Sequence, residues 1–197
     1  MNSSYFGQIA KKPIVFLSLI ATTTIAAVGI GAPAASAEER SCRGTIGAIT
    51  VDNLRVPQGE SCVLQGTKVK GTIKVERAAS LQASKVSVVG NVQGENARAV
   101  LVGNSTIGGS YQVVQGRNAG IVHSIVQGGI LLDDNTRGLT VRANRVNDSI
   151  QVFQNTGGVK IESNRVDGNL QCKENAPAPT GGGNIVQGNK EDQCASL

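Results

Sequence analysis

Aromatic residues are nearly absent from this 197-residue chain. There is no Trp, and of the three Phe and two Tyr only Tyr111 and Phe153 lie beyond residue 37. Aromatic rings normally supply much of the burial in a globular core. A core without them is built from Val, Ile, Leu and Ala, which favours many short, regular layers. The same scarcity removes the aromatic platforms on which sugar rings commonly stack.

A strong excess of one charge and a set of metal ligands are also missing. The chain has 19 basic and 14 acidic residues, and without Lys11 and Lys12 the balance is 17 to 14. This is far from the basicity of a nucleic-acid-binding domain, so no nucleic-acid partner is expected. The one histidine, His123, has no Cys or carboxylate at ligand spacing, so no metal or other cofactor is predicted.

A long apolar run occurs only at the start of the chain. Lys11 and Lys12 precede a mostly apolar stretch, residues 14–30, and the small-residue sequence "GAPAASA" ends at Ala37. This order is typical of a secretory signal peptide over residues 1–37. The run is also long enough for an uncleaved anchor, but its small-residue end favours cleavage. We therefore expect a secreted protein, held at the cell wall or released, with no membrane span after cleavage.

An internal repeat of 19–20 residues runs through the rest of the chain. One apolar position recurs at Val69, Val88, Ile107, Val126, Val146, Val166 and Val186. A second apolar position follows four residues later in six of these units, and an alternating apolar pair such as Val100 and Val102 comes later still. Alternation with period two, in Val and Ile, indicates short strands. Repeats of this length indicate a solenoid.

We predict an all-β fold, a single-stranded parallel β-helix of the pectin-lyase type but with minimal loops. About seven coils, each with two short strands, would stack at the inter-strand spacing, and the crossover rule makes the coil right-handed. Residues 38–62 are predicted as an N-terminal cap and first partial coil, and residues 63–175 as the β-helix. Residues 176–197 are predicted as a looping C-terminal cap, because Pro177, Pro179 and three glycines disfavour strand.

Asn and Cys residues follow the same repeat. Six Asn fall at two equivalent corners and are expected to form structural ladders: Asn144, Asn164 and Asn184 at one, Asn135, Asn155 and Asn175 at the other. Asn tolerates the left-handed conformation, and stacked Asn side chains can bond one another. The four Cys beyond residue 37 are spaced by about one coil, which predicts the disulfides Cys42–Cys62 and Cys172–Cys194.

The stretch "GNLQCKENAPAPTGGGNIVQGNKEDQC", Gly168 to Cys194, together with the Ala-rich leader, resembles small secreted bacterial proteins of the actinobacterial type. The specific similarity covers roughly the last thirty residues, and the looser repeat covers the whole chain after the leader. The resemblance implies export and a right-handed β-helix. It brings no catalytic residues with it.

Two functions are open at this point. The leading one is a non-catalytic structural or interaction protein of the cell surface, whose partner is an anionic cell-wall polymer or polysaccharide. Lys68, Lys70 and Lys74 are expected to form a basic comb on one strand face, either for polyanions or as protection of a strand edge. The sequence does not define the oligomeric state.

The alternative is a lyase or hydrolase of acidic polysaccharides. Many parallel β-helices cleave such polymers, using clustered acids with Arg or Lys. Asp148 and Asp167 are predicted near one corner of adjacent coils, where the equivalent Arg145 and Arg165 would neutralise them. A solvated salt-bridge ladder explains the same pattern. Minimal coils also leave no long loops to wall a cleft.

Overall fold

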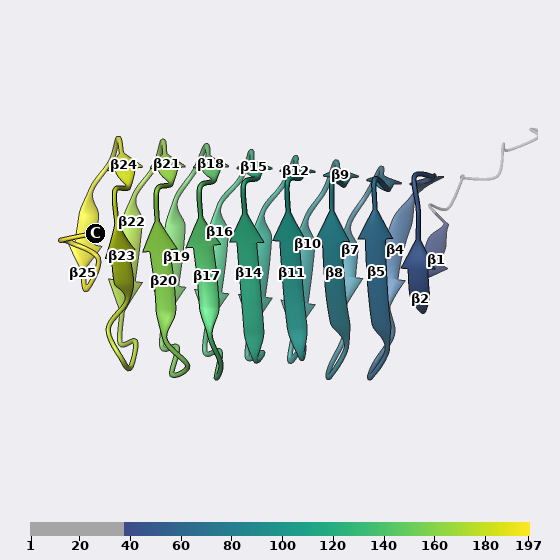
Figure 1. Cartoon of the computed structure of the whole chain (residues 1–197), viewed down its shortest axis with the longest axis horizontal. Coiled ribbons are helices and arrows are strands. Elements are labelled where there is room, and N and C mark those ends of the chain that lie inside the picture. Colours follow the sequence, from purple (N-terminus) through teal and green to yellow (C-terminus); the bar gives the residue numbers. More distant parts are fainter. Residues whose placement is uncertain (1–37) are drawn as a thin grey trace, which may run out of the picture. The chain divides into compact units, whose positions relative to one another are not determined.

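The described part of the chain is an all-β solenoid. The computed structural model describes residues 38–197, and the signal-peptide prediction for residues 1–37 lies outside them. Each coil contributes one strand to each of three parallel sheets (Figure 1). In Figure 1 the chain rises through the front sheet, crosses at the top and descends behind while it advances from right to left. The predicted right-handed parallel β-helix is therefore confirmed.

The three sheets are called A, B and C. Sheet A contains β1 (Glu39–Ser41), β4 (Asn53–Val56), β7 (Ile73–Val75), β10 (Val92–Glu95), β13 (Tyr111–Val114), β16 (Ile130–Asp133), β19 (Ile150–Phe153), β22 (Leu170–Lys173) and β25 (Lys190–Asp192). Sheet B contains β2 (Gly44–Ile46), β5 (Ser61–Gln65), β8 (Ser80–Ser84), β11 (Ala99–Gly103), β14 (Asn118–Val122), β17 (Leu139–Arg142), β20 (Val159–Glu162) and β23 (Thr180–Gly182). Sheet C contains β3 (Thr50–Val51), β6 (Lys68–Val69), β9 (Ser87–Val88), β12 (Thr106–Ile107), β15 (Ile125–Val126), β18 (Arg145–Val146), β21 (Arg165–Val166) and β24 (Ile185–Val186).

Neighbouring coils pair in the register that the repeat predicts. Val69 pairs with Val88 in sheet C, and Ile73 pairs with Val92 in sheet A. These side chains are buried in a core built mainly of Val, Ile, Leu and Ala. Because each coil covers the apolar side of the next, stability depends on contacts between successive coils.

The structure corrects the number of strands in a coil. Two strands were predicted, but the apolar anchor and the apolar residue four positions later lie on different strands. Val69 is on β6 and Ile73 is on β7, with a corner between them at Gly71. A Cβ at Gly71 would collide with the Asn53 side chain one coil earlier, which favours glycine at this corner. Eight three-stranded coils precede β25, where about seven coils were predicted.

Both ends of the solenoid are more regular than predicted. The expected partial coil within residues 38–62 is a complete one, formed by β1, β2 and β3. The expected looping cap over residues 176–197 contains β23, β24 and β25, so that prediction is wrong as stated. Pro177 and Pro179 lie before β23, outside any strand, and Gly181 and Gly182 are on β23, an edge strand that pairs only with β20.

Two disulfides join the end coils to their neighbours. Cys42 is bonded to Cys62 and Cys172 to Cys194, with Cα atoms 5.6 and 5.2 Å apart. The bonded residues are not directly above each other, because Cys62 pairs in register with Gly44 and Cys172 with Asp192. Each disulfide therefore crosses between coils diagonally, at a Cα separation that disulfides commonly have.

The six Asn form two buried ladders parallel to the solenoid axis. Asn155 is typical, because its Oδ1 accepts hydrogen bonds from the backbone N–H and the Nδ2 of Asn135, at 2.9 and 3.0 Å. Its own Nδ2 donates to the Leu132 carbonyl and to Asn175 Oδ1. The other ladder repeats this pattern from Asn144 through Asn164 to Asn184.

The six ladder Asn do not themselves adopt the left-handed conformation. The prediction that Asn occurs at these corners because it tolerates that conformation is therefore wrong. The residue before each of them does, as in Asp134 (φ 52°), Gln154 (φ 55°) and Ala143 (φ 54°). The left-handed residue turns the chain outward. The following Asn then points into the coil, where its amide satisfies backbone groups of the neighbouring coils.

Two polar columns were not predicted. Ser105 and Ser124 extend the second Asn ladder towards the N-terminus, because Ser105 N–H donates to Ser124 Oγ and Ser124 N–H donates to Asn144 Oδ1. A further column lies at the corner between sheets C and A, where one side chain accepts from the backbone N–H of the next coil. Its acceptors are Asn53, Thr72, Asn91, Ser110, Ser149 and Asn169.

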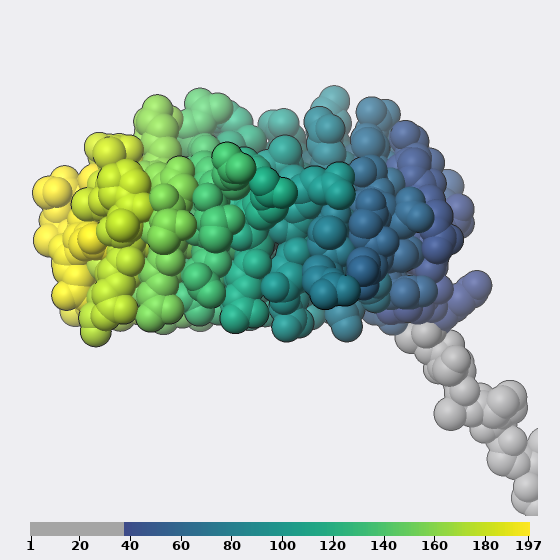
Figure 2. All heavy atoms as spheres, turned by 90° about the horizontal axis from the view of Figure 1, so that it is seen from below, coloured from purple at the N-terminus to yellow at the C-terminus, as the bar shows by residue number. Residues whose placement is uncertain are grey.

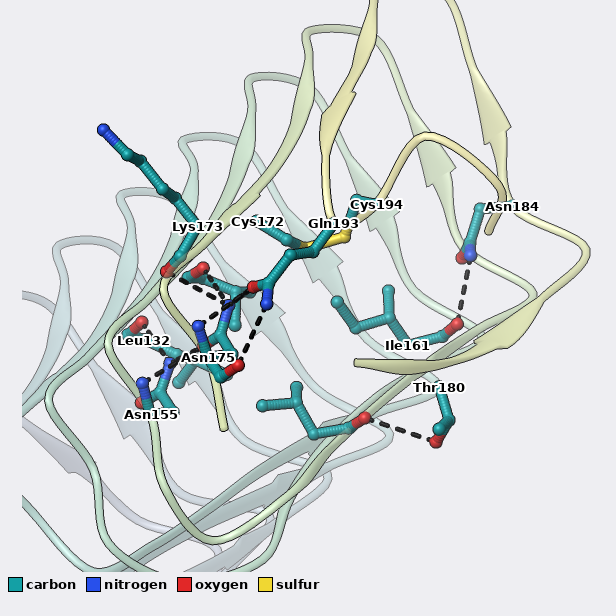
Figure 3. The surroundings of a disulfide bond; sticks show 12 residues. Leu132, Asn155, Ile161, Cys172, Lys173, Asn175, Thr180, Asn184, Gln193 and Cys194 are labelled. Carbon is teal, nitrogen blue, oxygen red and sulfur yellow. Dashed lines mark hydrogen bonds between the residues drawn. A yellow bond between two sulfur atoms is a disulfide. The ribbon is translucent and has the colours of Figure 1, made fainter. Parts of the chain in front are cut away.

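Gln193 ends the first Asn ladder. Its Oε1 accepts from the N–H and Nδ2 of Asn175, at 2.9 and 3.0 Å, and its Nε2 donates to the Asn175 carbonyl at 2.9 Å (Figure 3). The adjacent Cys194 is held by its disulfide to Cys172, so the glutamine is fixed over the ladder. The Gln193 side chain thus occupies the position that the next asparagine of the ladder would take.

We expect Gln193→Ala to loosen the last coil by about 1–2 kcal/mol, because Asn175 loses buried partners. Amide hydrogen exchange should accelerate at Asn175 and in β22 while β11 and β14 stay protected, since opening in a solenoid spreads between neighbours. Gln187→Ala is the control, because the Gln187 side chain is exposed and bonds only the Asp167 carboxylate. Equal exchange in the two variants would remove Gln193 as the cap.

Candidate functional site: an arginine column beside a hollow on sheet B

The three lysines of the predicted comb do not share a strand face. Lys68 is on β6 in sheet C, Lys70 is at the following corner, and Lys74 is on β7 in sheet A. Lys70 is also paired with Asp52, with Nζ 3.0 Å from Oδ1, and this contact lowers the pKa of the aspartate. The comb is therefore divided between two sheets, because the corner at Gly71 turns the chain between Lys70 and Lys74.

Of the Asp and Arg residues of the catalytic alternative, Arg145 and Asp167 form one surface ion pair. Arg145 and Arg165 pair in register in sheet C, and Arg145 Nη2 lies 3.4 Å from Asp167 Oδ2. Asp167 also accepts from Gln187. Asp148 instead accepts the N–H of its neighbour Ser149 at 2.7 Å. The Arg145–Asp167 pair fits the predicted salt bridges, and Asp148 and Asp167 share no hydrogen-bond partner.

A polar groove of about 690 Å³ lies on sheet A. Of its charged lining residues Glu76 is ion-paired, whereas Lys74, Arg77 and Glu95 make no ion pair within residues 38–197. Lys74, Gln93, Gln112 and Glu76 are among the residues that line it. Glu76 accepts hydrogen bonds from the Gln58 N–H at 2.9 Å and from Arg55 Nη1 at 3.3 Å. These contacts lower the pKa of the Glu76 carboxyl and hold it against the preceding coil.

A column of three arginines lies at the corner between sheets A and B. Arg98, Arg117 and Arg137 occupy successive coils just before β11, β14 and β17. The backbone places them one above another, since Arg137 N–H donates to the Arg117 carbonyl at 3.1 Å and Asn118 N–H donates to the Arg98 carbonyl at 3.1 Å. We call these three residues the arginine column. Figure 2 views the coils from the side of this corner.

The charges of the arginine column are not compensated within residues 38–197. All three side chains are exposed, and none makes an ion pair with an acid of this part of the chain. Even Asp134, three residues before Arg137, is beyond ion-pair distance. Neighbouring coils are about 4.8 Å apart, and like charges at that spacing repel. A bound anion would relieve the repulsion.

A shallow hollow of about 510 Å³ lies on sheet B beside the arginine column. Gly138 leaves it open, since a Cβ there would meet no atom within 4 Å, and Leu101, which is 42% exposed, borders it. Asn118, Thr140 and Gln82 add polar groups. We call this feature the sheet B hollow. It spans the same coils as the arginine column.

Tyr111 shapes the sheet B hollow from inside. Its buried hydroxyl donates to the Val100 carbonyl at 2.7 Å and accepts the Gly120 N–H at 3.2 Å, so it stands between β11 and β14. Burial raises the pKa of this hydroxyl far above its ordinary value. Ala119, Gly120 and Ile121 on β14 are all buried. The outward side of Gly120 is covered by Leu101, whose Cδ2 would lie 3.1 Å from a Cβ at this position.

Sequence reasoning missed the arginine column, although a signal for it exists. Arg98, Arg117 and Arg137 are spaced by 19 and 20 residues, and each stands two residues before the alternating apolar pair of its coil. The repeat is most apparent at its apolar positions, and these do not include the arginines. The column contains three arginines because the equivalent positions of the flanking coils hold other residues. Ala79 occupies this position in the preceding coil. Gly157 occupies it in the following coil, where a Cβ would collide with the Arg137 backbone.

The described residues hold no group of three or more His, Cys, Asp or Glu placed to bind a metal ion. No helix that could cross a membrane is found in residues 38–197. Searches with this chain against protein-family models, curated proteins and solved structures return no match.

Proposed function

We propose that the protein is an exported, non-catalytic solenoid that binds anionic polymers along its arginine column. The observation that carries this proposal is the stack of three exposed guanidinium groups without carboxylate partners. Arginine presents a planar fork of donors that matches carboxylate and phosphate oxygens. A linear polyanion that lies along the solenoid axis would place successive charges beside successive coils.

Export is proposed from the N-terminal sequence and is supported by the two disulfides, which persist in oxidising compartments. Outside the cell, the polyanions that such a protein meets are wall polymers and acidic polysaccharides. The catalytic alternative has less support. Arg145 and Asp167 are engaged with each other, and Asp148 is bonded to its own backbone neighbour.

Binding of the 38–197 chain to isolated Gram-positive cell walls tests this function. We expect co-sedimentation at low salt that disappears at about three-fold physiological salt, because exposed charges are screened. Changing all three arginines of the column to Gln should weaken binding about 100-fold, since each exposed charge contact contributes up to about 1 kcal/mol.

The matched control changes Lys68, Lys70 and Lys74 to Gln. This variant loses the same net charge but keeps the arginine column, so its binding should fall by less than about five-fold. If both triple variants lose binding equally, net charge rather than the column is responsible. If the wild-type chain does not sediment at either salt concentration, the proposed function is wrong.

A further inference from the structure

We infer that the ligand of the arginine column is a polysaccharide that carries carboxylates on its sugar rings, and that one ring lies over the sheet B hollow. This inference rests on the proposed function and names the class of polymer. The column alone would accept any polyanion. The hollow is the feature that selects among them.

The sheet B hollow has the chemistry of a sugar subsite. The exposed side chain of Leu101 gives it an apolar surface, which suits the C–H face of a pyranose ring. Asn118 and Thr140 are at its edge, where amide and hydroxyl groups can bond the ring hydroxyls. Shallow depth suits a polymer, because the chain must enter and leave the hollow along the surface.

The position of the arginine column relative to the hollow favours a carboxylate on the ring. Arg117 is followed directly by Asn118, and Arg137 directly by Gly138, so the backbones of two arginines adjoin residues that line the hollow. A carboxylate bonded to the ring edge would therefore meet an arginine while the ring face covers Leu101. Polyphosphate and acidic polypeptides offer the charge but have no ring to cover this apolar surface.

Three polyanions separate these properties. Polygalacturonate has rings and carboxylates, polyglutamate has carboxylates without rings, and polyphosphate has neither. By isothermal titration calorimetry at equal ionic strength and equal concentration of charge, we expect the 38–197 chain to bind polygalacturonate at least ten-fold more tightly than the other two.

A variant that fills the hollow tests the ring position. Gly138 is exposed and a Cβ there would meet open space, so Gly138→Gln should fold normally and remove the preference for polygalacturonate. Gly47→Gln is the control, because Gly47 is also exposed with open space around it but lies in the first coil. It should retain the preference.

The outcomes separate this inference from the function on which it rests. If all three polyanions bind equally and Gly138→Gln matches the wild type, the sugar subsite is wrong while polyanion binding stands. If polyphosphate or polyglutamate binds more tightly than polygalacturonate, the ligand class is wrong. If none of the three binds, both the inference and the proposed function are overturned.

Discussion

Replacing Asn155 by alanine should destabilise the solenoid by roughly 3–5 kcal/mol, because its amide serves four buried groups at once. The Asn135 backbone N–H and Nδ2 lose their acceptor, and the Leu132 carbonyl and Asn175 Oδ1 lose a donor. Asn155 is fully buried, so water cannot replace these bonds without opening the coil. The cost is therefore the desolvation of several polar groups together.

Thermal unfolding followed by circular dichroism measures this effect, and we expect the Tm to fall by roughly 10 °C. Asn147→Ala is the matched control, since Asn147 is exposed and its Nδ2 bonds only the Gln127 side chain. That change should alter stability by less than about 0.5 kcal/mol. Equal melting of the two variants would show that the buried ladder contributes little.

The apolar positions and the Asn positions of the coil could be predicted from the sequence. The inward positions of the coil must be apolar in every layer, so Val69, Val88 and their equivalents repeat clearly. The Asn positions repeat because few side chains both accept and donate at that depth. Ser105 and Ser124 accept hydrogen bonds at equivalent positions of the same column. Because they are not Asn, the sequence does not show that the ladder extends towards the N-terminus.

Corners were the least predictable features, because their cause lies in the neighbouring coil. Gly71 separates β6 from β7, since the Asn53 side chain occupies the space where a Cβ would be. Without that knowledge the segment from Lys68 to Val75 reads as one strand, and the lysines appear to share a face. The arginine column was missed for a related reason, because no apolar pattern marks the corner between sheets A and B.

The second large effect is expected at Tyr111. The side chain is fully buried and is the largest in the core, so Tyr111→Ala should destabilise the solenoid by roughly 3–5 kcal/mol through the cavity that it leaves. Tyr111→Phe keeps the ring and removes only the hydroxyl that joins the Val100 carbonyl to the Gly120 N–H. We expect that variant to lose about 1–2 kcal/mol at pH 7.

The pH dependence distinguishes the hydroxyl from the ring. Burial raises the folded-state pKa of Tyr111 above its ordinary value of 10.0, so above pH 10 the unfolded chain loses a proton that the folded chain keeps. Wild-type stability should then decrease as the pH rises above 10, by up to about 1.4 kcal/mol per pH unit from this group. Lysines lose charge in the same range, and the Phe variant controls for them.

Chemical denaturation at pH 9, 10 and 11 gives the comparison. Tyr111→Phe should be less stable than the wild type at pH 9, and the difference between them should narrow towards pH 11. Tyr111 is the one tyrosine of residues 38–197, so its ultraviolet ionisation should coincide with unfolding. A tyrosine that ionises at pH 10 in the folded chain, with parallel stability curves for the two proteins, would mean that the hydroxyl does not stand between β11 and β14.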